Sequence, residues 1–292
     1  MRGHHPTLLV GNRQAGTGLE AGLLQRLAGI LDADLEIVAG HPEARQATSD
    51  WLATKPKPPP AAVIAGGGGG TLRALAEAVC EGSGQRHIRI GGLRLGSGNV
   101  IPKRYGIPRD AIAAAHQIKA CLDAGSTHPC AVIQCQFGEA NPRYGITMCG
   151  LGHFGRTSGD LVRFHERAGN LRRAAARVIP LERINDAEYL SSFLARMTVA
   201  ALVPTSCELV STDRRRFRLL AGVVLTRRDQ DSLPYYLVPR YGRPITGTLN
   251  KGESLTLTLE DRRHTEFFLD EDPEQATRAI TITAAGTLDF VA

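Results

Sequence analysis

Five consecutive glycines, Gly66–Gly70, constrain the fold of this 292-residue chain more than any other feature. An apolar run, 61–65, precedes them, and a helix-like segment, 71–79, follows. Glycines let backbone N–H groups approach an anion closely, and the N-terminus of the next helix adds a favourable partial positive charge. Strand, glycine run and helix in this order predict a phosphate site. The simpler alternative is a tight turn between a strand and a helix.

Two common glycine-loop motifs do not fit this run. A Walker A loop closes with a Lys-Ser or Lys-Thr pair, whereas Gly70 is followed by Thr71 and Leu72. A dinucleotide-binding loop requires an acidic residue about 20 positions later at a strand end, and residues 89–91 contain none. The glycine run alone therefore does not identify a ligand.

The first 125 residues alternate between strand-like and helix-like segments. Strands are predicted over 7–10, 35–38, 61–65 and 88–95, and helices over 18–31, 42–52, 71–79 and 110–122. This alternation predicts a parallel sheet flanked by helices, with ligand-binding loops at the carboxyl ends of the strands.

The pattern changes after about residue 126. Short β-rich runs separated by turn residues predict antiparallel strands over 131–133, 146–148, 219–226, 255–259, 267–269 and 280–283, with one helix over 186–199. We therefore expect an α/β fold with two domains. Residues 1–125 would form a Rossmann-like parallel sheet domain, and residues 126–292 a β-rich domain built as an antiparallel sandwich.

Composition and motifs exclude several classes of protein. No stretch approaches about 20 uncharged apolar residues, so a transmembrane span is excluded, and no long apolar segment follows Met1, as a secretory signal would require. The six cysteines are irregularly spaced, which indicates reduced thiols in a cytoplasmic protein, and Cys130 and Cys135 suit no common zinc site. The histidines lack paired-ligand spacing, and the absence of a G-x-S-x-G elbow leaves a serine hydrolase unsupported.

Three glycine-containing turns follow successive strands of the first domain. Residues 11–16 follow the first strand, residues 66–70 the third and residues 95–99 the fourth. Because the carboxyl ends of parallel strands meet at one edge of a sheet, a shared phosphate-binding rim is a better explanation than three unrelated turns.

The order of these turns resembles the diacylglycerol kinase catalytic domain, whose fold is shared by bacterial lipid kinases, sphingosine kinases and, more distantly, NAD kinases. The N-P-x-S-G turn of that family resembles Asn12–Gly16, and its G-G-D-G-T motif matches Gly67–Thr71. Its L-G-T-G-N-D loop, with a helix and L-G-I-P after it, matches Leu95–Pro108. Its G-x-G-F-D motif weakly resembles Gly150–Phe154, and its V-D-G-E motif weakly resembles Leu269–Asp272.

The resemblance implies transfer of the γ-phosphoryl group of ATP to a lipid hydroxyl, such as that of a diacylglycerol or sphingoid lipid, with Mg2+ as a cofactor. The C-terminal segment would return to the first domain and bring Asp270, with Asp272 near it, to the cleft between the domains, where Asp270 would act as the general base. The simpler alternative is that Asp270 is an exposed turn residue without a catalytic role. The nucleotide would lie across Asn12, Gly67, Gly68, Gly69, Gly70, Thr71, Gly96, Ser97, Gly98 and Asn99.

Three acidic residues of the family pattern are missing. The aspartate of G-G-D-G-T is Gly69 here, the glutamate three residues after the threonine is Ala74, and the aspartate of the N-D pair is Val100. Because such carboxylates hold magnesium in kinases of this type, the metal ligands of this chain stay unassigned. The departures leave two alternatives open: a catalytically impaired homologue that binds nucleotide or lipid for regulation, and an enzyme similar to NAD kinases.

Positive charge gathers in the middle of the chain, where residues 151–228 hold fourteen arginines against seven acidic residues. The group Arg163, Arg167, Arg172, Arg173 and Arg177 suggests peripheral contact with an anionic membrane, and a solvated surface is the simpler alternative. No nucleic-acid recognition motif accompanies these arginines, so we expect no nucleic-acid partner. A homodimer is left open.

Overall fold

The computed structural model describes residues 6–15, 20–54, 61–82, 88–96, 99–151, 205–210, 216–239, 241–259, 266–270, 272–275 and 279–292. Helices lie at α1 (Ala21–Leu31), α2 (His41–Thr54), α3 (Gly69–Glu81), α4 (Val100–Arg104) and α5 (Ala111–Ala124). Strands lie at β1 (Thr7–Asn12), β2 (Asp34–Val38), β3 (Ala62–Gly66), β4 (Arg89–Gly92), β5 (His128–Phe137), β6 (Arg143–Gly145), β7 (Met148–Leu151), β8 (Thr205–Val210), β9 (Arg216–Leu225), β10 (Leu233–Pro239), β11 (Ile245–Leu249), β12 (Ser254–Leu259), β13 (Glu266–Leu269), β14 (Asp272–Gln275) and β15 (Ala279–Val291).

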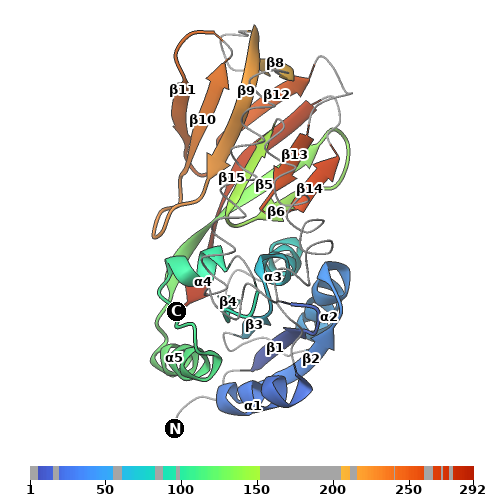
Figure 1. The fold of residues 1–292 in the computed structure, drawn as a ribbon, viewed down its shortest axis with the longest axis vertical. Helices are drawn as coiled ribbons and strands as arrows, with labels where there is room; N and C mark the ends of the chain where they lie inside the picture. Colours follow the sequence, from blue (N-terminus) through green and yellow to red (C-terminus); the bar gives the residue numbers. More distant parts are fainter. Residues whose placement is uncertain are drawn as a thin grey trace, which may run out of the picture.

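The N-terminal part is a parallel sheet between two pairs of helices (Figure 1). Its strands run in the order β4-β3-β1-β2, and every neighbouring pair is parallel. Helix α2 packs beside α3, and α1 packs beside α5. The expected parallel sheet flanked by helices is confirmed. Strand β3 is buried along its whole length and is apolar throughout, as a strand covered on both faces must be.

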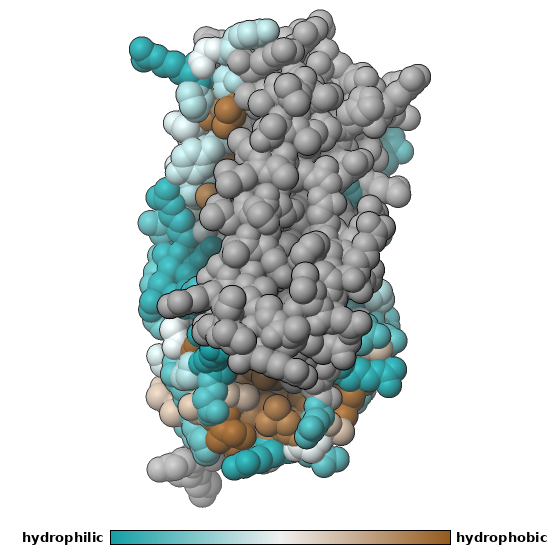
Figure 2. All heavy atoms as spheres, viewed as in Figure 1, coloured by the Kyte–Doolittle hydropathy of each residue, from teal (hydrophilic) through white to brown (hydrophobic). Residues whose placement is uncertain are grey.

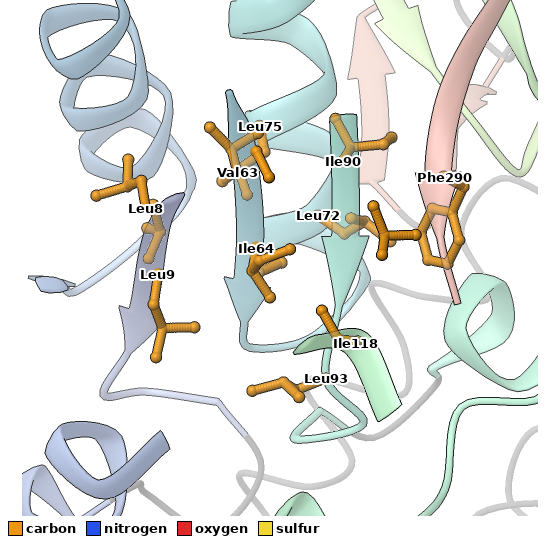
Figure 3. Close-up of a cluster of buried hydrophobic side chains, with 14 of the residues drawn as sticks. Leu8, Leu9, Val63, Ile64, Leu72, Leu75, Ile90, Leu93, Ile118 and Phe290 are labelled. Carbon is orange, nitrogen blue, oxygen red and sulfur yellow. The ribbon is translucent and has the colours of Figure 1, made fainter. Parts of the chain in front are cut away.

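The core of this part comes from strands and helices together (Figure 3). Leu8 and Leu9 of β1 are both fully buried although successive strand residues point to opposite faces, so each face of the sheet is covered. Leu75 of α3 and Phe290 of β15 belong to the same cluster. Full burial of side chains of this size contributes about 1.5–3 kcal/mol each.

The C-terminal part is an antiparallel sheet with its own core, as expected. Strands β5 and β15 are long enough to pair with each other over ten residue pairs, from Phe137 opposite Ile280 to His128 opposite Phe290. At one end β15 pairs with β12, and at the other it pairs in parallel with β4. The last strand of the chain thus joins the antiparallel strands to the parallel sheet in one hydrogen-bonded path (Figure 1).

One predicted strand differs from the structure. Residues 146–148 were expected to be a strand, but Ile146 and Thr147 form a bend between β6 and β7, and only Met148 is in a strand. The backbone N–H groups of this bend donate to the Asp270 carboxylate instead of to a neighbouring strand. The predicted helix 186–199 lies outside the described residues.

On the face drawn in Figure 2, hydrophobic residues reach the surface mainly toward the end of the molecule that carries α1 and α5. The described residues toward the opposite end of this face are mostly hydrophilic. Within the described part of the chain, no helix is both long and apolar enough to cross a membrane.

Candidate functional site

The glycine run lies at the junction between β3 and α3. Strand β3 ends at Gly66, and Gly68 is the N-cap of α3, where it offers no side-chain oxygen to the amides of the first turn. The first intrahelical bond runs from the Leu72 N–H to the Gly68 carbonyl oxygen, so the amides before Leu72 have no partner four residues back. This helix end can donate several N–H groups to an anion.

The three glycine turns meet, as the sequence predicts. Asn12 at the end of β1 donates from Nδ2 to Thr71 Oγ1 at 3.1 Å, which ties the first turn to the start of α3. The second and third turns touch through their backbones, because a Cβ placed on Gly96 would collide with the Gly68 Cα. Glycine is therefore required at this crossing.

Asn99 stabilises the third turn rather than extending away from it. Its Oδ1 accepts the Gly96 N–H at 3.0 Å, and its Nδ2 donates to the Gly96 carbonyl oxygen. The residue has a φ of 51°, in the left-handed region that asparagine tolerates, and it is the N-cap of α4. Both polar atoms of the side chain are thus engaged within its own loop.

One pocket brings together five of the eleven predicted site residues, which are Gly67, Gly68, Gly69, Asn99 and Asp270. Its empty volume is about 390 Å³, part of it open to solvent. The glycine run and α3 form one wall, β4 and α4 the second, and the 146–147 bend with Asp270 the third. The lining residues are Ala65, Gly67, Gly68, Gly69, Leu72, Gly92, Leu93, Asn99, Val100, Ile101, Pro102, Ile146, Thr147 and Asp270.

Asp270 follows β13 and is 5% exposed, so the alternative of an exposed turn residue is wrong. Its φ of 55° lies in the left-handed region. The Oδ1 atom accepts the N–H groups of Thr147 at 2.8 Å, Ile146 at 3.1 Å and Met148 at 3.2 Å, and Oδ2 accepts only that of Ile146, at 3.1 Å. Burial raises the pKa of the Asp270 carboxyl, and the nearby Arg73 charge and these N–H donors oppose the shift.

A second chain of hydrogen bonds connects this bend to α4. Thr226 Oγ1 lies 2.7 Å from the Ile146 carbonyl oxygen and 2.9 Å from that of Thr147. The same oxygen accepts a hydrogen bond from Arg104 Nη1 at 2.7 Å, at the end of α4. The bend that holds Asp270 is therefore fixed to the helix that forms the opposite wall of the pocket.

Sequence reasoning missed a buried ionic cluster behind the glycine run. Arg73 and Glu77 of α3 are both fully buried. Arg73 Nη2 lies 3.1 Å from Glu77 Oε1 and 2.7 Å from Glu274 Oε1. Glu77 also contacts Arg143 Nε at 3.1 Å and His41 Nε2 at 3.2 Å. The only sequence signal was the i, i+4 spacing of Arg73 and Glu77, which is common on exposed helix faces.

The cluster fixes the hairpin that carries Asp270. Arg73 Nη1 donates at 2.9 Å to the carbonyl oxygen of Leu269, the residue before Asp270. Burial of Glu77 opposes its ionisation, but the His41 side chain 3.2 Å away and the charges of Arg73 and Arg143 outweigh burial and lower the pKa of Glu77 to about 2. Glu77 is therefore ionised at neutral pH.

The remaining predicted residues fall into two groups. Thr71 is buried under the rim, and Gly70 lies in the first turn of α3, where a Cβ would meet nothing within 4 Å; neither lines the pocket. Ser97, Gly98, the Asp272 side chain and the group Arg163, Arg167, Arg172, Arg173 and Arg177 lie outside the described residues, so the expectations about them stay predictions.

The described pocket does not offer what a protein-bound magnesium ion requires. Mg2+ prefers oxygen ligands and is usually held by one or two carboxylates. Among the described residues of the pocket lining Asp270 supplies the one carboxylate, its Oδ1 accepts three backbone hydrogen bonds, and Oδ2 alone keeps a free acceptor position. Across the part of the chain that the structure describes, no group of three or more His, Cys, Asp and Glu residues could hold a metal ion.

The comparisons agree with the glycine motifs. Residues 6–134 match the sequence model of the diacylglycerol kinase catalytic domain, which confirms the resemblance. A crystal structure of a diacylglycerol kinase from Bacillus anthracis str. Sterne has a TM-score of 0.64 and 11% identity, with 98% of this chain and 96% of that chain covered. A second structure from the same strain, assigned as a diacylglycerol kinase, has a TM-score of 0.66 and 12% identity, with 98% and 97% covered. No curated protein sequence matches. At these identities the two structures establish the shared fold.

Proposed function

We propose, from the premise that residues 6–134 match the diacylglycerol kinase catalytic domain family, that this protein transfers the γ-phosphoryl group of ATP to the hydroxyl of a lipid. One observation carries the proposal: the glycine run and Asp270, about 200 residues apart in the sequence, line the same pocket. Phosphoryl transfer depends on positioning the phosphate and the attacking hydroxyl together, and this pocket provides a group for each.

The phosphate groups of the nucleotide would lie against the start of α3. Gly67, Gly68 and Gly69 line the pocket, so backbone N–H groups can approach a phosphate without side chains between them. The partial positive charge of the helix N-terminus favours the anion further. The crossing of Gly68 and Gly96 sets the distance between the second and third turns.

Asp270 would act as the general base for the lipid hydroxyl. Oδ2 accepts a single backbone hydrogen bond, so it keeps capacity to accept the hydroxyl proton. As the hydroxyl oxygen attacks the γ-phosphorus, its proton passes to Asp270. The bond from phosphorus to the β,γ-bridging oxygen breaks, and both of its electrons leave with ADP. The raised pKa of the buried carboxyl favours accepting this proton.

The test is phosphorylation of a panel of lipid alcohols with labelled ATP in the presence of magnesium, with separated lipids counted for label. The panel includes diacylglycerols of several chain lengths, a sphingoid base and, as a control from another class, NAD. Label in a lipid supports the proposal. Label only in NAD would replace it with the NAD kinase alternative.

A second candidate function is nucleotide or lipid binding without turnover. Two observations favour it: Gly69 occupies the position of the family aspartate, and Asp270 Oδ1 is satisfied by three backbone donors. Nucleotide binding in calorimetry, combined with no label in any lipid, would establish this candidate instead.

A further inference from the structure

The polar and apolar groups that line the pocket determine how a phosphate group can be held there. The glycines contribute N–H donors and no side chains, and Leu72, Leu93, Ile101 and Pro102 are apolar. The oxygen and the nitrogen of the Asn99 side-chain amide are both hydrogen-bonded to the Gly96 backbone. Asp270 is the one carboxylate among the described residues of this lining, and its hydrogen bonds come from the backbone N–H groups of residues 146–148. The lining is thus rich in donors to an anion and poor in ligands for a hard cation.

The neighbouring carboxylates are committed elsewhere. Glu77 is fully buried and contacts Arg73, Arg143 and His41. Glu274 is contacted by Arg73 at 2.7 Å and by Arg143 at 3.5 Å. Neither residue lines the pocket. Turning either carboxylate toward a metal ion would leave its arginine partners as uncompensated charges, and for the buried Arg73 this strongly opposes such a rearrangement.

From this mismatch between the pocket and the magnesium ligands of the family pattern, we propose that the rim binds nucleotide phosphate without a metal ion held by the protein. The inference rests on the nucleotide site of the proposed function. Gly69 is the deciding residue, because it lines the pocket where the family pattern has an aspartate. A divalent cation enters this site only as part of the nucleotide substrate.

The experiment is calorimetric titration of the full chain with ADP, once in excess EDTA and once in excess Mg2+. The two affinities of the wild type are expected to agree within about threefold, which is less than 1 kcal/mol. In the Gly69→Asp variant, the new carboxylate repels the phosphates unless a metal ion lies between them. ADP affinity in EDTA should fall at least about tenfold, and Mg2+ should restore most of it.

Gly22→Asp is the matched control for the added charge. Gly22 lies in the first turn of α1 and is exposed, and a Cβ added to it would meet nothing within 4 Å. In this variant the ratio of the ADP affinity in Mg2+ to the ADP affinity in EDTA should equal that of the wild type. Titration of paramagnetic Mn2+ into each protein with ADP bound gives an independent signal. With ADP bound, the wild type and Gly22→Asp should bind Mn2+ no more tightly than free ADP does, whereas Gly69→Asp should bind it more tightly.

The outcomes separate this inference from the proposed function. Wild-type ADP binding that requires Mg2+ would overturn the inference and leave the nucleotide site intact. A protein-held Mn2+ site in the wild type would do the same. Failure of ADP to bind under both conditions would overturn the nucleotide site itself, and this inference with it.

Discussion

Arg73 shows how a single side chain can hold two distant parts of this molecule together. Its fully buried guanidinium contacts Glu77 on its own helix, Glu274 on β14 and the Leu269 carbonyl oxygen on β13. A planar guanidinium with several donors suits such a site better than an ammonium group would. A buried charge is tolerated only when it is paired, so each partner of Arg73 is also needed for stability.

Replacing Glu77 with glutamine tests this cluster. Because the pKa of Glu77 is lowered in the folded state, its ionisation stabilises the fold above its unfolded-state pKa of about 4.5 and ceases to do so as pH falls toward 2. Glu77→Gln should lower the free energy of unfolding at pH 7 by roughly 3 kcal/mol, measured by denaturant titration, and the difference from wild type should shrink below pH 4.5.

The control is Glu81→Gln on the same helix. Glu81 pairs with Arg45 at 2.5 Å, but both side chains are partly exposed, so its loss should cost less than about 1 kcal/mol. If Glu77→Gln and Glu81→Gln lowered the free energy of unfolding equally, burial would not make the Glu77 ion pairs stronger than the Glu81–Arg45 pair.

Asp270→Asn tests the proposed general base with little disturbance of the fold. Asparagine tolerates a φ of 55° and keeps an acceptor oxygen for the three backbone donors. Turnover should fall by about 100- to 10,000-fold while ADP affinity stays within a factor of about three. Asp123→Asn, an exposed change on α5, should leave turnover unchanged.

The pH dependence of wild-type turnover follows from the raised pKa of Asp270. The base acts when deprotonated, so the rate should fall as pH is lowered through a pKa above the ordinary aspartate value. Protonation of Asp270 is favoured by the folded state, so its contribution to stability decreases as pH rises through the same pKa. A rate profile of the wild type without this acidic limb would contradict the assignment.

At the scale of elements, the site depends on where three turns cross. Helix α3 begins at the glycine run, α4 begins at Asn99, and the Gly68 and Gly96 backbones lie in contact between them. Side chains at this crossing would separate the turns, so the glycines act by allowing close approach and not by a positive φ.

Gly96→Ala tests the crossing. The added methyl group meets the backbone of Gly68, which cannot move aside as a flexible side chain would, so the two turns must separate. We expect ADP affinity to fall at least about tenfold in calorimetry. Gly29→Ala is the control, because Gly29 is an exposed residue of α1 with open space around it. It should keep ADP affinity and stabilise the protein by up to about 1 kcal/mol. Unchanged affinity in Gly96→Ala would show that the turns do not need to touch.

At the scale of the whole molecule, β5 and β15 connect the two sheets. The C-terminal end of β15 pairs with β4 of the parallel sheet, while its N-terminal end pairs with β12 of the antiparallel sheet. Phe290 near the end of β15 is fully buried and stacks on Tyr105 at 4.7 Å between ring centroids. Because these strands cross between the cores, the two parts should unfold together.

Phe290→Ala tests this coupling. Loss of a fully buried phenylalanine typically costs about 3–5 kcal/mol. Trp51, the single tryptophan, is buried in α2 and reports on the parallel part by fluorescence, while far-ultraviolet circular dichroism reports on all elements. In Phe290→Ala the unfolding midpoints measured by fluorescence and by circular dichroism should both move to the same lower denaturant concentration. Two separate transitions in the wild type would show that the parts unfold independently. Phe290→Leu should shift both signals less than the alanine variant does.

Local sequence patterns were enough to predict the α/β alternation, the antiparallel second half and the meeting of the three glycine turns. These features depend on short-range periodicity and on the missing Cβ of glycine, both of which are written in neighbouring residues. The burial of Asp270, the bend at Ile146 and Thr147, and the Arg73 cluster were decided by the tertiary structure. Arg73 and Glu77 have the spacing of an exposed ion pair, and they are buried because β6 and the β13–β14 hairpin pack over α3 from positions 66 to 201 residues away. Hydrogen-bond partners at such separations depend on which strands come to lie side by side, and no local pattern encodes that.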